Sequence, residues 1–261
     1  MSDSIFLERD GRFMPTNYAR GPWDPTSLHG GAPAALITEA FRREQPGDEL
    51  PIARLGFELL RPVPFAPLEL SVAIVRPGRR VQELAAELRC EGVLICRASA
   101  LRVQPVPEGL EVEGGPPVEE PMPGPQDGTP VDFALDDAAH ASFASAMEMR
   151  WLDDPGARGP ARVWIRPRTE LVTGAPLSPL ARLAAAADFG NGVSAALPFD
   201  RYIFINADLS IHVQREPRGE WIGLDARTLL HGGGTGLAES VLHDIDGPLG
   251  RALQTLVVQR R

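Results

Sequence analysis

The sequence lacks the features of membrane and nucleic-acid proteins. Its N-terminus has no apolar segment behind a basic start, and no later stretch reaches the roughly 18 apolar residues that a membrane span requires. It has no basic stripe, and its formal net charge of −9 would repel nucleic-acid phosphates. We therefore expect a cytosolic protein that binds neither membrane nor nucleic acid, and an anionic ligand would need a local basic patch.

Cysteine is nearly absent. Cys90 and Cys96 lie on either side of a predicted hairpin turn at Glu91-Gly92, which would place Cys90 near Val93 and Cys96 near Glu87. The two thiols are therefore not expected to form a disulfide, and neither has a His or Cys partner at metal-ligand spacing. We interpret both as small apolar strand residues in a reducing compartment, and expect no metal and no cofactor.

What the sequence does contain is a globular composition, with 43% hydrophobic residues in 261. Residues 105–131 are rich in Pro and Gly, acidic, and free of helical periodicity, which is typical of an extended linker. The chain is accordingly divided into residues 1–110, a linker at 111–140, and residues 141–261.

The two halves repeat one pattern. Residues 76–104 align without a gap on residues 231–259, with Glu91-Gly92 over Asp246-Gly247 and a closing Val-Gln in both. Both segments have a glycine-containing loop, a strand, a two-residue turn and a strand. A repeated supersecondary unit is therefore predicted.

Upstream of this repeat, each half has an apolar helix followed by strands. The first half has a helix at 32–44 and strands near 52–61 and 68–75, and the second has a helix at 179–189 and strands near 202–213, 221–229 and 236–245. Short leading strands are expected at 4–14 and 161–168. One alanine-rich helix with about five strands can bury itself only if the sheet wraps around it. This pattern predicts an α+β fold.

The segment "LHGGAPAALITEAF", followed by "FELLRPVPFAPLELSVAIVRPGRRVQELAAELRCEGVLICRASALRV", resembles the N-terminal hotdog domain of the acyl-CoA thioesterase II (TesB-like) family. The resemblance rests on a His-Gly-Gly helix start, a Leu-Arg-Pro strand and an Arg-x-Gly-Arg-Arg turn in that order. It implies a double hotdog, with two helix-wrapped antiparallel sheets in tandem forming one continuous sheet. Because hotdog sheets commonly pair side by side, it also implies a homo-oligomer.

The resemblance further implies hydrolysis of acyl-CoA thioesters by a water that an Asp on the second helix activates, with a Thr and a Gln on later strands. Asp188, Thr228 and Gln254 occupy those positions. A carboxylate at the end of an alanine-rich run costs stability unless something nearby uses it. The alternative is a solvated helix C-terminus, since Gly190 and Gly192 are ordinary helix-ending residues.

Strand alternation places Thr228 and Gln254 on apolar faces, with one strand between them. Each also has a purely structural interpretation. Thr228 can be a β-branched strand residue bonded to backbone, and Gln254 a satisfied core amide.

The remaining site candidates would bind substrate. Gly30 and Gly31 begin the first helix, where a backbone N–H could polarise the thioester oxygen, or they may serve close packing alone. His29 is either a neighbour of the helix cap or a polar group lining the site. The cluster of Arg76, Arg79 and Arg80 could bind CoA phosphates or form a solvated turn.

The sequence differs from the family pattern at one position, and two alternative functions are considered beside thioester hydrolysis. The better-known members of the family have a His directly after the catalytic Asp, where this chain has Phe189. The spacing of Asp24 and His29 fits a hotdog enoyl-CoA hydratase, although Asp24-Pro25 also reads as a turn. The third hypothesis is a hotdog that binds acyl-CoA or another apolar ligand without turning it over.

Overall fold

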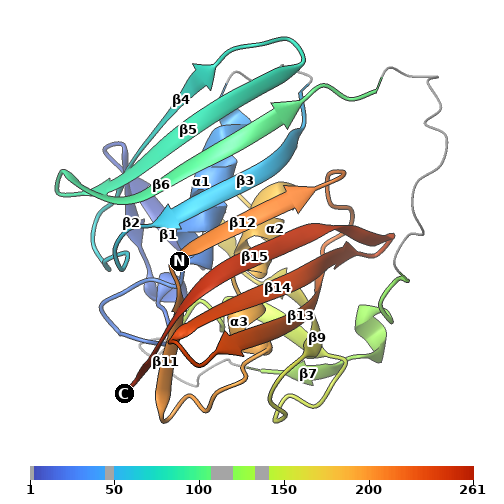
Figure 1. Cartoon of the computed structure of the whole chain (residues 1–261). Coiled ribbons are helices and arrows are strands. Elements are labelled where there is room, and N and C mark those ends of the chain that lie inside the picture. The colour runs from blue at the N-terminus through green and yellow to red at the C-terminus, as the bar shows by residue number, and fades with distance from the viewer. Residues whose placement is uncertain (1–2, 45–49, 107–119, 133–140) are drawn as a thin grey trace.

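One large sheet dominates the molecule. The computed structural model describes residues 3–44, 50–106, 120–132 and 141–261. In these residues twelve strands form one sheet and three short strands form a second. The helices α1 (Gly31–Arg43) and α2 (Pro179–Ala187) lie on the same side of the large sheet and pack against each other (Figure 1). The predicted α+β architecture with a continuous sheet is confirmed.

The first half contributes four strands in the order β4-β5-β6-β3. These are β3 (Ile52–Leu59), β4 (Glu69–Arg76), β5 (Val81–Cys90) and β6 (Val93–Val103). The β5–β6 hairpin turns through Glu91 and Gly92, whose φ angles of +49° and +78° fit a tight two-residue turn that glycine favours.

Both cysteines lie on this hairpin and are free. Cys90 pairs with Val93 as predicted. The register shifts between Leu88 and Arg89, so Cys96 lies opposite Leu88 and the predicted proximity to Glu87 is wrong by one residue. Burial raises the pKa of the Cys96 thiol to about 12, consistent with an inert core residue.

The second half continues the same sheet in the order β12-β15-β14-β13-β9-β8. Its strands are β8 (Met147–Trp151), β9 (Ala161–Pro167), β12 (Asp208–Val213), β13 (Ile222–His231), β14 (Thr235–Asp244) and β15 (Gly247–Arg260). The halves join where β12 pairs antiparallel with β3, from Asp208 opposite Glu58 to His212 opposite Arg54. The predicted tandem arrangement is therefore continuous through backbone hydrogen bonds.

The β14–β15 hairpin corresponds to β5–β6, but the gapless alignment is displaced by one residue at its turn. Asp244 pairs with Gly247, so the turn residues are Ile245 and Asp246 instead of Asp246 and Gly247. Gly247 opens β15 with a φ of +114°, a conformation that other residues rarely adopt. Counting from the turn, each first-half residue corresponds to the second-half residue 154 positions later, as Cys90 does to Asp244.

Two predicted strands differ in the structure. Residues 4–14 form a hairpin of β1 (Ser4–Arg9) and β2 (Arg12–Pro15), and β1 pairs in parallel with β10 (Glu170–Val172) instead of leading the main sheet. The predicted strand 202–213 breaks at Ala207 into β11 (Tyr202–Asn206) and β12. Because β11 pairs only with β15, the chain can bend at this point.

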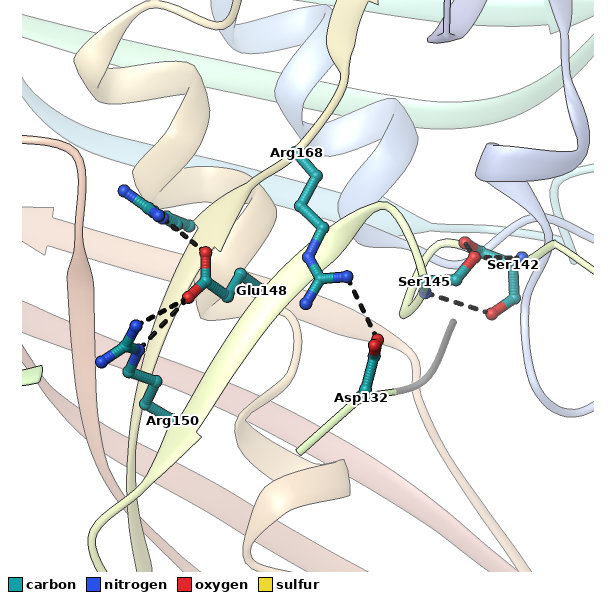
Figure 2. A network of polar contacts seen from close by, with 7 residues as sticks. Asp132, Ser142, Ser145, Glu148, Arg150 and Arg168 are labelled. Atoms are coloured by element: carbon teal, nitrogen blue, oxygen red, sulfur yellow. Dashed lines mark hydrogen bonds and ion pairs between the residues drawn. The ribbon is translucent and has the colours of Figure 1, made fainter. Parts of the chain in front are cut away.

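The predicted linker is only partly described, since residues 107–119 and 133–140 lie outside the described residues. Its later part packs on the second half. After the 3-10 turn η2 (Pro125–Asp127), the strand β7 (Thr129–Val131) pairs with β8 at the end of the sheet. Figure 2 shows Arg168 bonded to Asp132, 3.1 Å apart, near the Glu148 carboxylate that holds Arg150.

The large sheet ends at β4 and β7, and the predicted self-association across such edges stays a prediction. Within the described ranges, no helix has both the length and the apolar character that crossing a membrane would demand.

Candidate active site

A cavity of about 510 Å³ opens where the two halves meet. Five segments line it: the loop 21–30 before α1, residues 59–63 at the end of β3, the turn after α2, strand β11 with Ala207, and the end of β15. Much of the lining is apolar, as in Leu28, Leu60 and Ile203, while Asp188, His29 and Asn206 bring polar atoms. An apolar pocket with a few convergent polar groups is the usual form of a small-molecule site.

Asp188 ends α2. The helix starts at the N-cap Ser178, whose hydroxyl accepts the N–H of Ala181, and stops when Asp188 caps it. The Asp188 side chain is only 3% exposed, so the alternative of a solvated terminus is wrong. Its Oδ1 accepts a hydrogen bond from Nδ2 of Asn206 at 2.9 Å. Its Oδ2 lies 2.9 Å from Nδ1 of His29. A buried carboxylate requires such partners.

The Asp188 carboxylate lies against the first turn of α1, from the other half of the chain. A Cβ on Gly30 would stand 2.8 Å from Oδ2 and 3.0 Å from Oδ1 of Asp188, so only glycine fits at this N-cap. A Cβ on Gly31 would meet the Ala185 carbonyl and the Phe143 ring at 2.7 Å. The positive end of the α1 dipole favours an ionised carboxylate here. Close packing therefore explains both glycines, whatever else they do.

His29 is fixed between aromatic rings. Its ring centroid lies 4.8 Å from that of Phe143 and 4.5 Å from that of Phe189. Nδ1 accepts the N–H of Gly31 at 3.1 Å and lies 2.9 Å from Asp188 Oδ2. A ring nitrogen has either a lone pair or a hydrogen, so accepting from Gly31 and donating to the Asp188 carboxylate are alternative states of Nδ1. Phe189, the residue directly after Asp188, thus packs against the imidazole of His29, which belongs to the first half.

Gln254 on β15 is 2% exposed and fully bonded. Its Oε1 accepts the N–H of Asn191 at 3.0 Å. Its Nε2 donates to the Asp188 carbonyl at 3.2 Å and to Asp188 Oδ1 at 3.3 Å. The amide therefore fixes both the backbone and the carboxylate of Asp188, and it lies behind them, outside the cavity lining.

Gly190 and Gly192 do not have the helix-ending role that the alternative interpretation gave them. They lie in α3 (Gly190–Val193), a single turn that follows Asp188 and Phe189. A Cβ on Gly190 would stand 2.8 Å from Ser240 Oγ and 2.9 Å from Gln254 Oε1, so glycine lets this turn approach the strands. Close approach, and not helix termination, explains that residue.

Thr228 is the predicted member of the constellation that the structure does not bring to the carboxylate. It lies opposite Ala238, which lies opposite Gln254, so the predicted intervening strand is confirmed. Its Oγ1 is 2.8 Å from Ser194 Oγ, and the Ser194 hydroxyl donates to the Gly190 carbonyl. Thr228 therefore holds α3, and it is absent from the cavity lining.

Asn206 is the residue that sequence reasoning missed. It ends β11 and lines the cavity, and Nδ2 donates to Asp188 Oδ1 at 2.9 Å and to the Asp208 carbonyl at 3.1 Å. Its Oδ1 has no protein partner in the described part of the chain. The available signal was the stretch "INADL", where two polar residues flank an alanine and interrupt an apolar strand.

The predicted CoA-binding cluster lies elsewhere. Arg76 ends β4, and Arg79 and Arg80 belong to the turn before β5; none of the three lines the cavity. Asp24 and His29 both line it, as the hydratase hypothesis requires. However, the Asp24 carboxylate accepts the hydroxyl and the N–H of Thr26 at 2.7 Å each, and these bonds lower the pKa of Asp24. The two residues therefore have separate partners.

Models of protein families match both halves of the chain. The acyl-CoA thioesterase N-terminal domain matches residues 19–103, and the acyl-CoA thioesterase C-terminal domain matches residues 116–258. None of the curated proteins compared with the chain matches it significantly.

Solved structures resemble the chain over nearly its whole length. A conserved protein with a hot dog fold from Alicyclobacillus acidocaldarius has a TM-score of 0.73 at 18% identity, covering 98% of this chain and 97% of its own. The tesB protein of Mycobacterium avium subs paratuberculosis has 0.69 at 16%, with 97% and 96% covered. Acyl-CoA thioesterase II TesB2 of Mycobacterium marinum has 0.64 at 16%, with 98% and 94% covered.

At these identities the structures establish the fold, and the predicted double hotdog is confirmed. The family models establish more, because the C-terminal model alone spans over half of the 261 residues. The chain therefore belongs to the acyl-CoA thioesterase family, and it is a thioesterase.

Proposed function

We propose that the protein hydrolyses acyl-CoA thioesters with Asp188 as the general base. The observation that carries the proposal is the Asp188 carboxylate, which is buried at the cavity wall and has polar partners from both halves. A thioester carbonyl is electrophilic and its thiolate leaves readily, so a positioned water suffices and no protein nucleophile is required.

The attacking water is placed between Asp188 and Asn206. A carboxylate has about four lone-pair positions. Asn206 and Gln254 both donate to Oδ1, and His29 lies against one side of Oδ2, so a position on Oδ2 remains for the water. The Asn206 Oδ1 atom can accept the other hydrogen of the same water. With its two hydrogens donated to Asp188 and to Asn206 Oδ1, the water would direct an oxygen lone pair toward a thioester in the cavity.

The charge that develops on the thioester oxygen would be stabilised at the start of α1. Gly30 lines the cavity, and its amide donates to no acceptor among the described residues. A helix N-terminus directs N–H dipoles at such an oxyanion. We therefore assign the oxyanion contact to the backbone at Gly30, next to the base.

Gln254 and Thr228 act through other residues in this proposal. Gln254 positions Asp188, and Thr228 positions α3 through Ser194. Asn206, and not Thr228, then takes the polar position beside the base. The hydratase hypothesis has weaker support, because the Asp24 carboxylate is bonded to Thr26 and His29 to Asp188.

The test is CoA release from a panel of short, medium and long acyl-CoAs. Asp188→Asn keeps the size of the side chain and the acceptor for Asn206 but removes the base. We expect a fall in kcat of at least about a hundredfold, the size of a lost general base. Thermal unfolding and acyl-CoA binding of both proteins, measured at equal concentration, show that the variant is folded and competent to bind.

A variant that retains more than a tenth of the native rate would contradict the role of Asp188. A native protein that binds acyl-CoAs but releases no CoA would contradict the proposed reaction with these substrates. Hydration of an enoyl-CoA without CoA release would favour Asp24 and His29 as the reacting pair.

A further inference from the structure

We propose that Arg61 binds a phosphate group of the CoA moiety at the mouth of the cavity. The inference rests on the proposed function, and it names the cation that this function needs. The chain contains no lysine, so its permanent cations are arginines. Among the described residues that line the cavity, Arg61 is the one arginine.

The backbone around Arg61 is anchored on both sides. The Leu59 N–H donates to the Ala207 carbonyl at 2.9 Å, and Ala207 directly follows the Asn206 that contacts Asp188. After Pro62, the Val63 carbonyl accepts the Leu28 N–H at 2.8 Å, next to His29. Arg61 therefore projects from a fixed segment that borders the catalytic residues on two sides.

The Arg61 guanidinium is available. It is exposed, and the structure gives it no ion pair or hydrogen bond in the described residues. The neighbouring Arg20 differs, because its Nε donates to Asn17 Oδ1 at 2.9 Å and its guanidinium lies 3.8 Å from the centroid of the Phe65 ring. A free guanidinium can bind a phosphate through two parallel hydrogen bonds, which an already engaged one cannot.

Of the cavity-lining residues that the structure describes, every charged side chain other than Arg61 is a carboxylate, or His29 if it is protonated. The carboxylates are Asp24, which Thr26 engages, and Asp188, which His29, Asn206 and Gln254 engage. The net charge of −9 disfavours the approach of an anionic substrate in general. The apolar part of the lining suits an acyl chain, so the phosphates of the substrate are expected at the exposed rim where Arg61 lies.

The experiment compares Arg61→Ala with Arg97→Ala, a matched control at an exposed arginine on β6, outside the cavity lining. One acyl group is offered on three carriers: CoA, dephospho-CoA and N-acetylcysteamine, which has no phosphate. For acyl-CoA we expect Arg61→Ala to raise KM about tenfold with little change in kcat, as for a lost charge-assisted contact. Added salt should shrink this difference. The N-acetylcysteamine thioester should be hydrolysed equally by native protein and both variants.

The dephospho-CoA carrier identifies the phosphate. Dephospho-CoA lacks the 3′-phosphate but keeps the diphosphate. If Arg61→Ala leaves the KM for the dephospho-CoA thioester unchanged, Arg61 binds the 3′-phosphate. If KM still rises, Arg61 binds the diphosphate. An equal loss on N-acetylcysteamine, or an unchanged KM for acyl-CoA, would overturn the proposal. Calorimetric titration of CoA itself tests Arg61 without turnover, so failure of the proposed hydrolysis and failure of this assignment are distinguishable.

Discussion

The two helices end in the same way in sequence and differently in space. α1 is capped by Glu44 and α2 by Asp188, so each half closes its helix on a carboxylic acid. Glu44 turns into extended backbone with a ψ of 119°, and its carbonyl accepts a hydrogen bond from the buried Arg102. Asp188 keeps helical angles and its side chain is buried. One half uses its helix end for packing, and the other uses it for the site.

The strands behind the helices show the same contrast. Counted from the hairpin turns, Gln254 corresponds to Ala100, and both are buried. The amide that fixes Asp188 thus replaces a methyl group at a matched position. The first half in turn provides His29 and the Gly30 backbone against which the carboxylate lies. A repeated fold therefore specialises by dividing one site between its copies.

The largest effect is expected from a substitution that pushes the Asp188 carboxylate of the second half away from Gly30 of the first half. Gly30→Ala would place a Cβ 2.8 Å from Asp188 Oδ2, so the carboxylate must move. We expect kcat to fall on the order of a hundredfold, because displacement of a reacting group by about an ångström has that cost. The matched control is Gly192→Ala, where a Cβ meets nothing within 4 Å.

Steady-state CoA release and thermal unfolding of both alanine variants measure the effect. Gly192→Ala should keep its activity, and its stability should rise by up to about 1 kcal/mol, since alanine suits a helix better than glycine. Full activity in Gly30→Ala would mean that the contact between the halves is not part of the catalytic geometry.

A second comparison separates Asn206 from Thr228. Asn206→Ala removes a donor to Asp188 and an acceptor for the water, and we expect kcat to fall about tenfold to a hundredfold. Thr228→Val keeps the shape and removes the bond to Ser194. It should cost about 1 kcal/mol of stability and change kcat by no more than about threefold. The reverse order of the two kcat values would restore Thr228 as the water-binding residue.

A smaller effect, on stability, is expected at the turns of the two corresponding hairpins, where Asp244 before the β14–β15 turn corresponds to Cys90 before the β5–β6 turn. Burial alone would raise the pKa of Asp244, but hydrogen bonds from Arg215 and from the amides of Arg218 and Asp246 outweigh it and hold that pKa below its usual range. Because the folded pKa is depressed, the stabilisation is present above the unfolded pKa of about 3.9 and is lost as pH falls through the folded value.

Asp244→Asn should therefore lower the free energy of unfolding by about 2–3 kcal/mol at pH 7. Urea titrations of native protein and variant at pH 7 and pH 3 measure the difference, which should shrink at pH 3. Cys90→Ala should cost about 1 kcal/mol at both values, because burial raises the pKa of its thiol and it stays protonated. A pH-independent loss in Asp244→Asn would mean that shape, and not charge, matters there.

The elements with strong local signals were predictable. The alanine-rich run ending at Asp188, the Glu91-Gly92 turn and the alternation that placed Thr228 and Gln254 on inner faces follow from helical period, turn chemistry and strand period. These signals give a residue's face but not which strand the helix end lies over. Thr228 is level with Gln254 in the sheet, and the signals could not show that Asp188 lies over β15 while Thr228 contacts Ser194.

The polar contacts between distant segments were not predictable. Asn206 contacts Asp188 from the end of β11, where the predicted strand breaks at Ala207, and no local pattern links these two residues. The N-terminal hairpin pairs with β10 from the other half, across 160 or so residues that no local pattern links. Arg61 lies in the Leu-Arg-Pro motif, but its exposure at a cavity is a property of the folded chain that no local pattern gives.

The contact between Gly30 and Asp188 should make the catalytic rate depend on how closely the two halves pack against each other. The proposed base Asp188 belongs to one half and the helix start at Gly30 to the other, so a slight loosening between β3 and β12 would separate them while each half kept its fold. Activity should accordingly fade on warming before any spectroscopic sign of melting. A ligand bound in the cavity, which both halves line, should delay that loss more than it delays unfolding.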